Sequence, residues 1–321
     1  MRLEDIGFYT LSNQRALTAT KDTRLQRCEM ILTDRCNFKC PYCRGLREDL
    51  QGSIPQLEAE RILSLWIRDR LRCVRFSGGE PLLYLGLMDL VTQCKEGGVE
   101  RIAISSNGSA RLDRYLGLIE AGVNDLSISL DGACCSVGDT MSGGVKSWDR
   151  VVSNIREIKD RTDCYVTVGA VFTEANRDEW QKLILFAEDL GVDDVRIIPA
   201  AQYKKAIEAL EDLPQRVLDK FPILRYRVQN VRAGRNVRGL ECGAAKCRLA
   251  FDDMAVAQGW HFPCIIHMRE GGDPIGKMGP DFRQDRADWV KRHDPYSDPI
   301  CRANCLDVCK DYNETAALRS E

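Results

Sequence analysis

Short β-rich runs and longer amphipathic segments alternate along residues 28–199 of this 321-residue chain, and that order restricts its fold more than any other feature. The longer segments repeat apolar residues at helical spacing, as Val151, Ile155 and Ile158 do. Strands separated by helices predict a parallel sheet, because parallel neighbours need a crossover connection. The expected strands are 28–32, 73–77, 101–105, 125–130, 165–171 and 194–199, and the expected helices are 58–70, 82–96, 112–121, 146–161 and 177–190.

Such a sheet is either open or curled into a partial barrel. In both forms, ligands bind at the carboxyl ends of the strands, where the strand-to-helix loops lie. The length and the 44% hydrophobic content allow one large core, with or without a small appendage. We therefore look for function in the loops that follow the six expected strands.

Charge and hydropathy exclude several classes of partner. The 46 basic and 48 acidic residues nearly cancel, so nothing draws the whole chain toward nucleic acid or an anionic membrane. No apolar stretch reaches the roughly 18 residues that a membrane span needs. The first residues carry Arg2, Glu4 and Asp5 and lack the apolar run of a signal peptide. We expect a cytoplasmic protein without a membrane or nucleic-acid partner.

The chain has 15 cysteines, an odd number. In a reducing compartment they are poor candidates for a disulfide framework, so clustered cysteines favour metal binding. Cys73, Cys94 and Cys164 are isolated in apolar surroundings, and we expect them to be buried as small hydrophobic residues.

One cysteine cluster directly follows the first expected strand. Cys36, Cys40 and Cys43 have the spacing C-x3-C-x2-C. Three thiolates on one loop can hold three irons of a cubane and leave the fourth iron open to a ligand. A structural zinc site closes with four ligands, and the three histidines lie far downstream, at His261, His267 and His293. An iron–sulfur cluster is the better interpretation.

The next three loops carry polar and glycine residues that suit a bound cofactor. The second expected strand ends in Ser77-Gly78-Gly79-Glu80, and glycine lets backbone approach a ligand closely because it has no Cβ. Asn107 and Ser129 close the third and fourth strands. Their Asn-Gly and Asp-Gly contexts are weaker indicators, because both pairs also form ordinary turns.

With Tyr42 just before the third cysteine and the Gly-Gly-Glu-Pro motif behind it, the chain resembles the radical S-adenosylmethionine (SAM) superfamily. The resemblance implies a [4Fe–4S] cluster on Cys36, Cys40 and Cys43, with SAM on the open iron. Reductive cleavage of SAM would give a 5′-deoxyadenosyl radical that abstracts hydrogen. It implies a flavodoxin or ferredoxin as electron donor, Glu80 as acceptor for the methionine ammonium, and further SAM contacts from Tyr42, Ser77, Gly78, Gly79, Asn107 and Ser129.

A second cysteine cluster lies near the C-terminus. Cys247, Gly259 and Cys264 have the spacing C-x11-G-x4-C, which resembles the opening of the SPASM or twitch extension of radical SAM enzymes. The resemblance implies one auxiliary [4Fe–4S] cluster on Cys242, Cys247, Cys264 and Cys309, with Cys301 or Cys305 as replacements for Cys309. A mixed zinc site that includes His261 and His267 is an alternative, and inert structural cysteines are another. The four-residue spacing of Cys301, Cys305 and Cys309 predicts one helical face.

Two other groups have both a functional and a plain interpretation. Cys134 and Cys135 follow the fourth strand, where a thiol could donate a hydrogen atom or stabilise a radical, or could simply pack in the loop. Five arginines between Arg225 and Arg238 could bind phosphate or carboxylate, or form a solvated linker face.

The predicted organisation is an N-terminal extension (1–24), a partial (β/α)6 TIM-like barrel (25–205), a connector (206–240) and a twitch-like or SPASM-like iron–sulfur domain with a tail (241–321). The tail is expected to begin near Asn313, and we find little periodicity after Cys242. The last three residues, 319–321, lack the double glycine that ends the molybdenum-cofactor GTP cyclase, which argues against that enzyme.

We therefore expect a radical SAM enzyme of oxidoreductase or lyase type acting on a small polar substrate by oxidation, decarboxylation, epimerisation or rearrangement. A peptide maturase that makes crosslinks or epimers is the alternative, although about 35 residues before the cluster leave no room for a winged-helix peptide-recognition domain. A non-catalytic iron–sulfur or zinc protein, acting as redox sensor or scaffold, is the alternative of another class.

Overall fold

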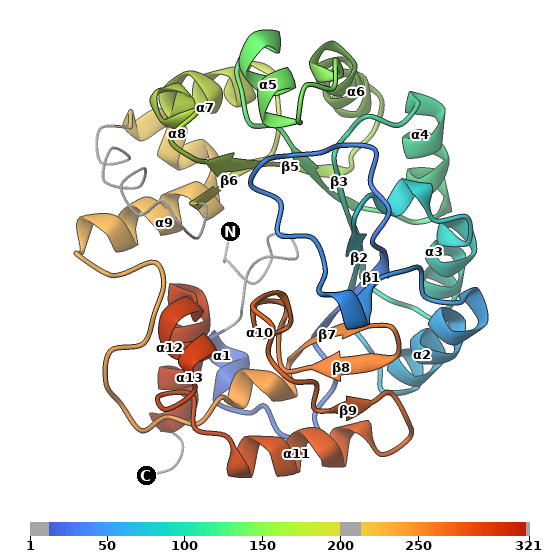
Figure 1. The fold of residues 1–321 in the computed structure, drawn as a ribbon, viewed down its shortest axis with the longest axis vertical. Coiled ribbons are helices and arrows are strands. Elements are labelled where there is room, and N and C mark those ends of the chain that lie inside the picture. The colour runs from blue at the N-terminus through green and yellow to red at the C-terminus, as the bar shows by residue number, and fades with distance from the viewer. Residues whose placement is uncertain (1–12, 200–212, 319–321) are drawn as a thin grey trace.

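Six parallel strands form a curved sheet with helices along its outer side (Figure 1). The computed structural model describes residues 13–199 and 213–318, so parts of the predicted N-terminal extension, barrel, connector and tail lie outside the described residues. The six strands neighbour one another in chain order, as a series of crossover connections requires. Their bounds are β1 Arg27–Thr33, β2 Cys73–Gly78, β3 Arg101–Ser106, β4 Asp125–Ser129, β5 Tyr165–Phe172 and β6 Asp194–Pro199.

The six predicted strands are confirmed, with ends that differ by no more than one residue from those expected. The helices between them are α2 Gln56–Arg68, α3 Leu87–Glu96, α4 Leu112–Ala121, α5 Cys135–Met141, α6 Trp148–Arg161 and α7 Trp180–Asp189, followed after β6 by α8 Gln215–Lys220 and α9 Pro222–Arg232. The partial barrel predicted from the alternating pattern is thus the observed architecture.

Three predicted helices begin later than the periodicity indicated. Helix α7 begins at Trp180, after a 3₁₀ turn at Arg177–Glu179. The segment 82–96 divides into a 3₁₀ turn, Pro81–Leu83, and helix α3, because Tyr84 has extended backbone angles. Helix α6 begins at Trp148 rather than at residue 146, because the Asp139 carboxylate accepts the backbone N–H groups of Ser147 and Trp148 at 3.0 Å each. The repeat of apolar residues along the sequence does not predict local hydrogen bonds of this kind.

The main core lies between the sheet and the outer helices. Strand residues such as Phe76 and Ile104 pack there with Trp66 of α2 and Tyr115 of α4, all fully buried. Burial of large apolar side chains is the main favourable contribution to folding. Cys73, Cys94 and Cys164 are buried, as predicted.

The C-terminal segment continues the same sheet. Strand β7 (Asp253–Ala257) pairs in parallel with β1 on the side opposite β2, and β8 (Trp260–Phe262) and β9 (Gly276–Lys277) extend the sheet as antiparallel strands. Four helices accompany them: α10 Ile265–Arg269, α11 Phe282–Arg292, α12 Pro299–Asn304 and α13 Asp307–Ala317. The expectation of little periodic structure after Cys242 is therefore wrong. Strands β7–β9 and helices α10 and α12 are only two to six residues long and show no repeat, whereas α11 and α13 have 11 residues each. The domain boundaries themselves stay a prediction.

The expected solvated tail is also wrong for the residues just after Asn313. Helix α13 packs against α1 (Asn13–Ala16) near the other end of the chain (Figure 1), and Tyr312 and Ala316 are buried. The Tyr312 hydroxyl donates to Asp252, which also accepts from Arg15 at 2.9 Å. No helix among residues 13–199 and 213–318 is both long and apolar enough to cross a bilayer.

Candidate active site

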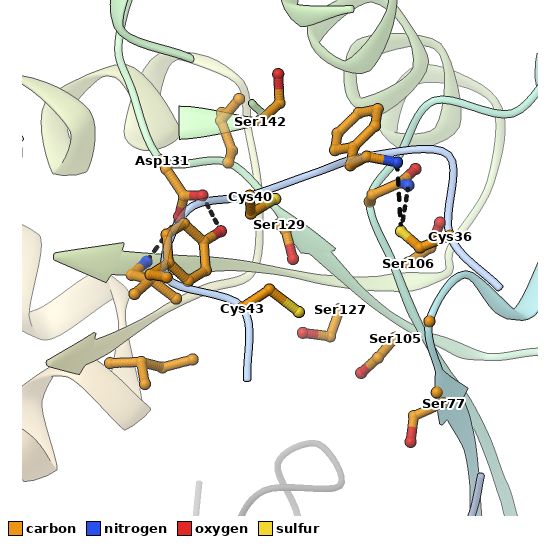
Figure 2. Close-up of a pocket in the computed structure, with 18 of the residues that line it drawn as sticks. Cys36, Cys40, Cys43, Ser77, Ser105, Ser106, Ser127, Ser129, Asp131 and Ser142 are labelled. Atoms are coloured by element: carbon orange, nitrogen blue, oxygen red, sulfur yellow. Dashed lines mark hydrogen bonds between the residues drawn. The ribbon is translucent and has the colours of Figure 1, made fainter. Parts of the chain in front are cut away.

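A cavity of about 400 Å³ opens at the carboxyl ends of the parallel strands. The loop after β1 carries Cys36, Cys40 and Cys43, and all three line this cavity (Figure 2). Small hydroxylated residues from neighbouring strands and loops line it as well: Ser77, Ser105, Ser106, Ser127, Ser129 and Ser142 (Figure 2). The cysteine triplet therefore shares one cavity with side chains from β2, β3 and β4.

The surroundings of the three thiols suit iron rather than a closed zinc site. The Phe38 N–H points at the Cys36 sulfur at 3.4 Å, and the Asn107 amide lies 3.9 Å from the same atom. Burial raises the pKa of the Cys36 thiol and raises that of Cys40 to about 11, so a metal must displace their protons. No histidine is among the described residues that line the cavity. The donor set fits a cluster held by three cysteines.

Gly78 and Gly79 line the cavity, and both lie against the base of the cysteine loop. A Cβ at Gly78 would overlap the backbone oxygen of Thr33, and a Cβ at Gly79 would overlap that of Arg35. The two segments are joined by hydrogen bonds from the Gly79 N–H to Thr33 and from the Glu80 N–H to Arg35, at 2.7 and 2.8 Å. The glycines thus let two backbone segments meet. This role is additional to the close approach to a ligand that the motif predicted.

Glu80 does not line the cavity, in contrast to the direct ligand contact expected for it. Its carboxylate is buried and accepts from the Asn107 N–H at 2.7 Å, the Ser106 hydroxyl at 3.0 Å and the Leu82 N–H at 3.1 Å. Burial raises its pKa, and these hydrogen bonds oppose that shift. The side chain joins the loops after β2 and β3 through these hydrogen bonds, and its contact with the methionine ammonium stays a prediction.

The other predicted cofactor contacts line the cavity, and the side chains of three of them are already hydrogen-bonded. The Ser77 hydroxyl donates to the Glu29 carboxylate. The Asn107 amide donates to Asn37 at 2.8 Å and its oxygen accepts from Ser109. The Tyr42 hydroxyl donates to Asp131, a buried carboxylate that also accepts from a backbone N–H of β5. Burial raises the pKa of Asp131 to about 6 in spite of these bonds. Ser129 is exposed to the cavity.

Five arginines line the cavity, and all of them except Arg238 were absent from the predicted candidates. Within the described residues, two acidic side chains, Glu29 and Asp131, line it with them, and a third acid, Glu270, pairs with Arg44 and lies 4.0 Å from Arg238. The five are Arg44, Arg75, Arg196, Arg238 and Arg269. A signal for some of them exists in the sequence: polar residues at alternate positions of otherwise apolar strands, such as Arg75 with Ser77, point into a barrel.

Arg75 and Arg269 differ in how their charges are balanced. Arg75 lies 3.5 Å from the Glu29 carboxylate and donates to Ser105. Arg269 donates to the backbone oxygens of Gly45 and Gly78, at 2.7 and 3.4 Å, and within the described residues it forms no ion pair. Burial lowers its pKa, which marks a desolvated cation that would gain from a bound anion.

Among the arginines predicted between 225 and 238, Arg238 alone lines the cavity. Arg227 pairs with Asp307 at 2.9 Å and Arg235 with Asp311 at 3.4 Å. These acids belong to α13, so Arg227 and Arg235 tie α9 and the segment after it to the C-terminal helix. Neither of them lines the cavity, so for both the anion-site hypothesis stays a prediction without a contact.

The second group of cysteines surrounds a small, mostly apolar cavity of about 40 Å³. The cysteines that line it are Cys247, Cys264, Cys301, Cys305 and Cys309. Two groups donate toward these sulfurs: the His267 N–H to Cys264 at 3.4 Å and the Asn313 amide to Cys247 at 3.8 Å. Burial raises the pKa of the Cys247 thiol to about 12. Five thiols around one cavity fit an auxiliary cluster, which needs four.

One expectation about this group is corrected by the structure, and another stays a prediction. Cys242 is exposed and is not among the described residues that line the cavity, so its role as a cluster ligand stays a prediction without a contact. The three last cysteines do not share a helical face, because α12 ends at Asn304 and α13 begins at Asp307. The helix is interrupted there, because the Cys305 oxygen accepts the Gly239 N–H and the Asp307 N–H donates to the Val237 oxygen.

Of the remaining candidates, His267 lines the cysteine cavity and the other three line neither cavity. His261 is fully buried, 3.3 Å from Arg286, and does not line the cysteine cavity, which weakens the zinc alternative that included it. His267 does line that cavity. Cys134 and Cys135 are exposed at the start of α5 and line neither cavity, so their catalytic role stays a prediction without a contact.

Comparisons with known proteins agree with the fold and the cysteine loop. The model of the radical SAM superfamily matches residues 30–187. Two solved structures share the fold: anSMEcpe with bound AdoMet and the Cp18Cys peptide (TM-score 0.60, 15% identity, 92% of this chain and 97% of that one), and Streptococcus suis SuiB bound to precursor peptide SuiA (TM-score 0.58, 17% identity, 87% and 66%). Residues 30–187 therefore form a radical SAM domain, and enzymes of that superfamily use a [4Fe–4S] cluster and SAM as cofactors. The Cys-rich C-terminal segment lies outside this match, and its assignment as a SPASM or twitch extension stays a prediction.

Curated relatives cover a smaller part of the chain. A probable GTP 3′,8-cyclase of Metallosphaera sedula is 28% identical over 54% of this chain and 55% of its own length. Another, from Saccharolobus solfataricus, is 30% identical over 59% of this chain and 62% of its own length. The chain thus matches little more than half the length of these relatives.

Proposed function

We propose that this enzyme abstracts a hydrogen atom from a small substrate that carries phosphate or carboxylate groups. When bound, the reduced cluster and SAM supply one-electron chemistry that removes hydrogen from a C–H bond and leaves methionine and 5′-deoxyadenosine. The observation that carries the substrate class is the described part of the cavity wall, where five arginines lie with two acids beside the cysteine triplet and a third acid, Glu270, pairs with Arg44. Arginine binds both phosphate and carboxylate in a bidentate manner.

The arginine excess favours an anionic substrate because SAM cannot offset it. The sulfonium and ammonium groups of SAM are positive, and its single carboxylate can pair with one guanidinium. Arg269 supports this argument most directly, since it is desolvated and bound to backbone oxygens. An anion placed there would pair with a buried charge in a low-dielectric environment, where such pairs are strong.

The chain's own residues would hold the cofactors as follows. Cys36, Cys40 and Cys43 bind the cluster, and the backbone of Gly78 and Gly79 with Ser77 forms the wall beside it. Tyr42, Asn107 and Ser129 would contact SAM. Glu80 acts as a positioning residue, because it fixes the loop of Asn107 through a hydrogen bond of 2.7 Å.

The auxiliary [4Fe–4S] cluster would be held by Cys247, Cys264, Cys305 and Cys309. It lies in the segment whose Arg269 and Ile265 reach the main cavity, so it could exchange an electron with the substrate radical or help to position the substrate. A flavodoxin or ferredoxin would supply the first electron. These requirements suit the cytoplasm.

Iron content and SAM cleavage test the cofactor part of this proposal. Anaerobically reconstituted protein should contain about eight irons per chain and form 5′-deoxyadenosine with dithionite. The triple variant Cys36/Cys40/Cys43→Ala should keep about four irons and lose this activity. A triple variant that still makes 5′-deoxyadenosine would sink the proposal.

Substrate class is tested by deuterium transfer from a substrate to 5′-deoxyadenosine. GTP is the first compound to try, because the relatives are named as GTP cyclases, followed by its nucleoside without phosphates and by small carboxylates. Arg269→Gln should raise KM for an anionic substrate by about tenfold to a hundredfold, as expected for a lost charged hydrogen bond. Arg111→Gln, at an exposed ion pair on α4, is the control. Equal turnover of charged and uncharged compounds would contradict the proposal.

The peptide-modifying alternative stays open, because two of the solved structures with this fold, one of anSMEcpe and one of SuiB, contain a bound peptide. A peptide substrate would require deuterium transfer from a labelled peptide and little effect of Arg269→Gln. The cavity of about 400 Å³ suits a small molecule or one peptide side chain, so the arginine variant decides between the two.

A further inference from the structure

Three potential metal ligands converge beside the auxiliary-cluster cavity, between α11 and α12. They are the ring nitrogen of His293, the carboxylate of Asp298 and the thiol of Cys301, whose ligand atoms all lie within 4.8 Å of one another. The Cys301 sulfur is 3.6 Å from Nε2 of His293. A tetrahedral zinc ion with ordinary Zn–S and Zn–N bonds would hold these two atoms about 3.5 Å apart.

The fold fixes the orientation of His293. Its ring stacks on Trp289 with centroids 4.0 Å apart and planes at 17°. Its backbone N–H donates to the Trp289 oxygen at 2.8 Å, and its own oxygen accepts from Lys246 at 3.0 Å. The ring nitrogen that faces Cys301 is therefore aimed by contacts that do not depend on a metal.

Asp298 is fixed in a similar way. One carboxylate oxygen caps α12 by accepting the Cys301 N–H at 2.8 Å, which keeps Asp298 and Cys301 in register. The other oxygen lies 3.5 Å from Nε2 of His267, a buried ring packed against Gly272. His267 can thus orient Asp298 from behind, as partners outside the ligand set do at metal sites.

Cys301 is the thiol that the auxiliary cluster does not need. Five cysteines line that cavity, whereas a cubane takes four. Within the described residues, Cys301 alone among the five has its sulfur in contact with a histidine ring nitrogen. It lies on α12, and the interruption between α12 and α13 separates it from Cys309 on α13.

We propose that His293, Asp298 and Cys301 form a mononuclear zinc site, separate from the auxiliary cluster, with His267 orienting Asp298. Nitrogen, oxygen and sulfur donors together suit zinc, and all three residues are only partly buried, so an ion can enter. The site would fasten the start of α12 to the end of α11 and so hold the segment that precedes Cys305 and Cys309. The assignment relies on the proposed cluster ligands Cys247, Cys264, Cys305 and Cys309.

Zinc and iron are measured together on anaerobically purified protein reconstituted with iron and sulfide and then supplied with zinc. The wild type should hold about one zinc per chain in addition to its iron. His293→Ala and Asp298→Asn should lose that zinc and keep the iron; asparagine preserves the helix cap while removing the carboxylate. Asp294→Asn, which changes a neighbouring exposed carboxylate outside the group, should keep both metals.

Cobalt(II) gives a second readout that does not depend on activity or on how well a variant is purified. Added to the wild type in place of zinc, it should show tetrahedral d–d bands and a thiolate charge-transfer band, and Cys301→Ser should lose the latter. A Cys247/Cys264→Ser variant should lose about four irons and retain zinc, which separates failure of the cluster assignment from failure of this one. Two results would overturn the proposal: wild type without zinc or cobalt bands, or His293→Ala losing iron instead of zinc.

Discussion

The absence of a Cβ atom at residues 78 and 79 sets the position of the loop that carries Cys36, Cys40 and Cys43. Their glycines let the end of β2 meet the backbone of Thr33–Arg35, directly before Cys36. Glu80 then joins the same segment to the loop after β3. The Gly-Gly-Glu motif therefore holds backbone segments together, and it brings the cysteine loop and the Asn107 loop to one cavity.

Gly79→Ala should displace the cysteine loop, because the added Cβ overlaps the Arg35 oxygen and neither backbone segment can move freely. We expect a loss of about 3 kcal/mol in the free energy of unfolding and of most of the iron bound by the first cluster. Urea denaturation and iron analysis check this. Gly117→Ala, where the Cβ would make only an ordinary contact at 3.7 Å inside α4, should be neutral or slightly stabilising.

The raised pKa of the buried Asp194 carboxyl predicts how the free energy of unfolding varies with pH. Burial raises its pKa to about 7, although the backbone N–H groups of Ile223 and Val195 oppose the shift. The folded state therefore holds this proton over a range where the unfolded state, with a pKa near 4, has released it. The stabilisation is complete below that unfolded pKa and is lost as the pH rises through 7.

Asp194→Asn should remove that dependence. The wild type should lose stability between pH 4 and 7 relative to the variant, in urea titrations at several pH values. Parallel curves for the two proteins would show that the Asp194 carboxyl titrates normally in the folded state. Asp113→Asn, at an exposed carboxylate on α4, serves as the matched control.

At the scale of elements, α11 holds the C-terminal strands through one side chain. Arg286 is fully buried and donates to the backbone oxygens of Ala250 (2.6 Å), Phe262 (3.0 Å) and Pro263 (3.2 Å), and also to that of Asp253. These oxygens belong to β7, β8 and the segments beside them, which lead directly to Cys247 and Cys264. The guanidinium thus sets the positions of two proposed cluster ligands.

Arg286→Lys should cost about 3 kcal/mol of stability, because an ammonium cannot reach all of these oxygens and leaves buried carbonyls without donors. It should also lower auxiliary iron by weakening the Cys247–Cys264 segment. Urea denaturation with iron analysis measures both. Arg292→Lys, an exposed arginine at the end of the same helix, should change neither, and equal losses in the two variants would contradict this role.

At the scale of the whole molecule, β1 is the central connection. It pairs with β2 on one side and with β7 on the other, so the barrel and the C-terminal segment share one sheet. Helix α1 also packs on α13, and Arg27 of β1 pairs with Asp253 of β7 at 3.0 Å. Two predicted domains that share a strand pair should not unfold independently.

We therefore expect one cooperative transition in urea. Far-UV circular dichroism and tryptophan fluorescence should give the same midpoint, since Trp66 and Trp148 report on the barrel and Trp260 and Trp289 on the C-terminal segment. A chain cut after residue 240 should aggregate, because it would expose β1 as an unpaired edge. Two separate transitions, or a soluble and folded truncated chain, would show that the predicted boundary marks independent domains.

The sequence by itself determined the six parallel strands, the cavity at their carboxyl ends and the cysteine loop beside it. These follow from local periodicity, from the crossover rule and from residues close together along the chain, such as Cys36, Cys40 and Cys43. The burial of Cys73, Cys94 and Cys164 was predictable for the same reason. Contacts within one element or one loop can be predicted, because the residues that make them recur at regular spacings along the sequence.

Only the tertiary structure decided what depends on segments far apart. Arg75, Arg196 and Arg269 meet in one cavity although they are separated by more than 70 residues at each step, and no spacing predicts this. Cys242 falls outside the auxiliary cavity and Cys301 contacts His293, because the backbone of 237–239 breaks the helix at Cys305. Glu80 turned out to bind loops rather than line the cavity, since depth below a surface is a property of packing and not of sequence.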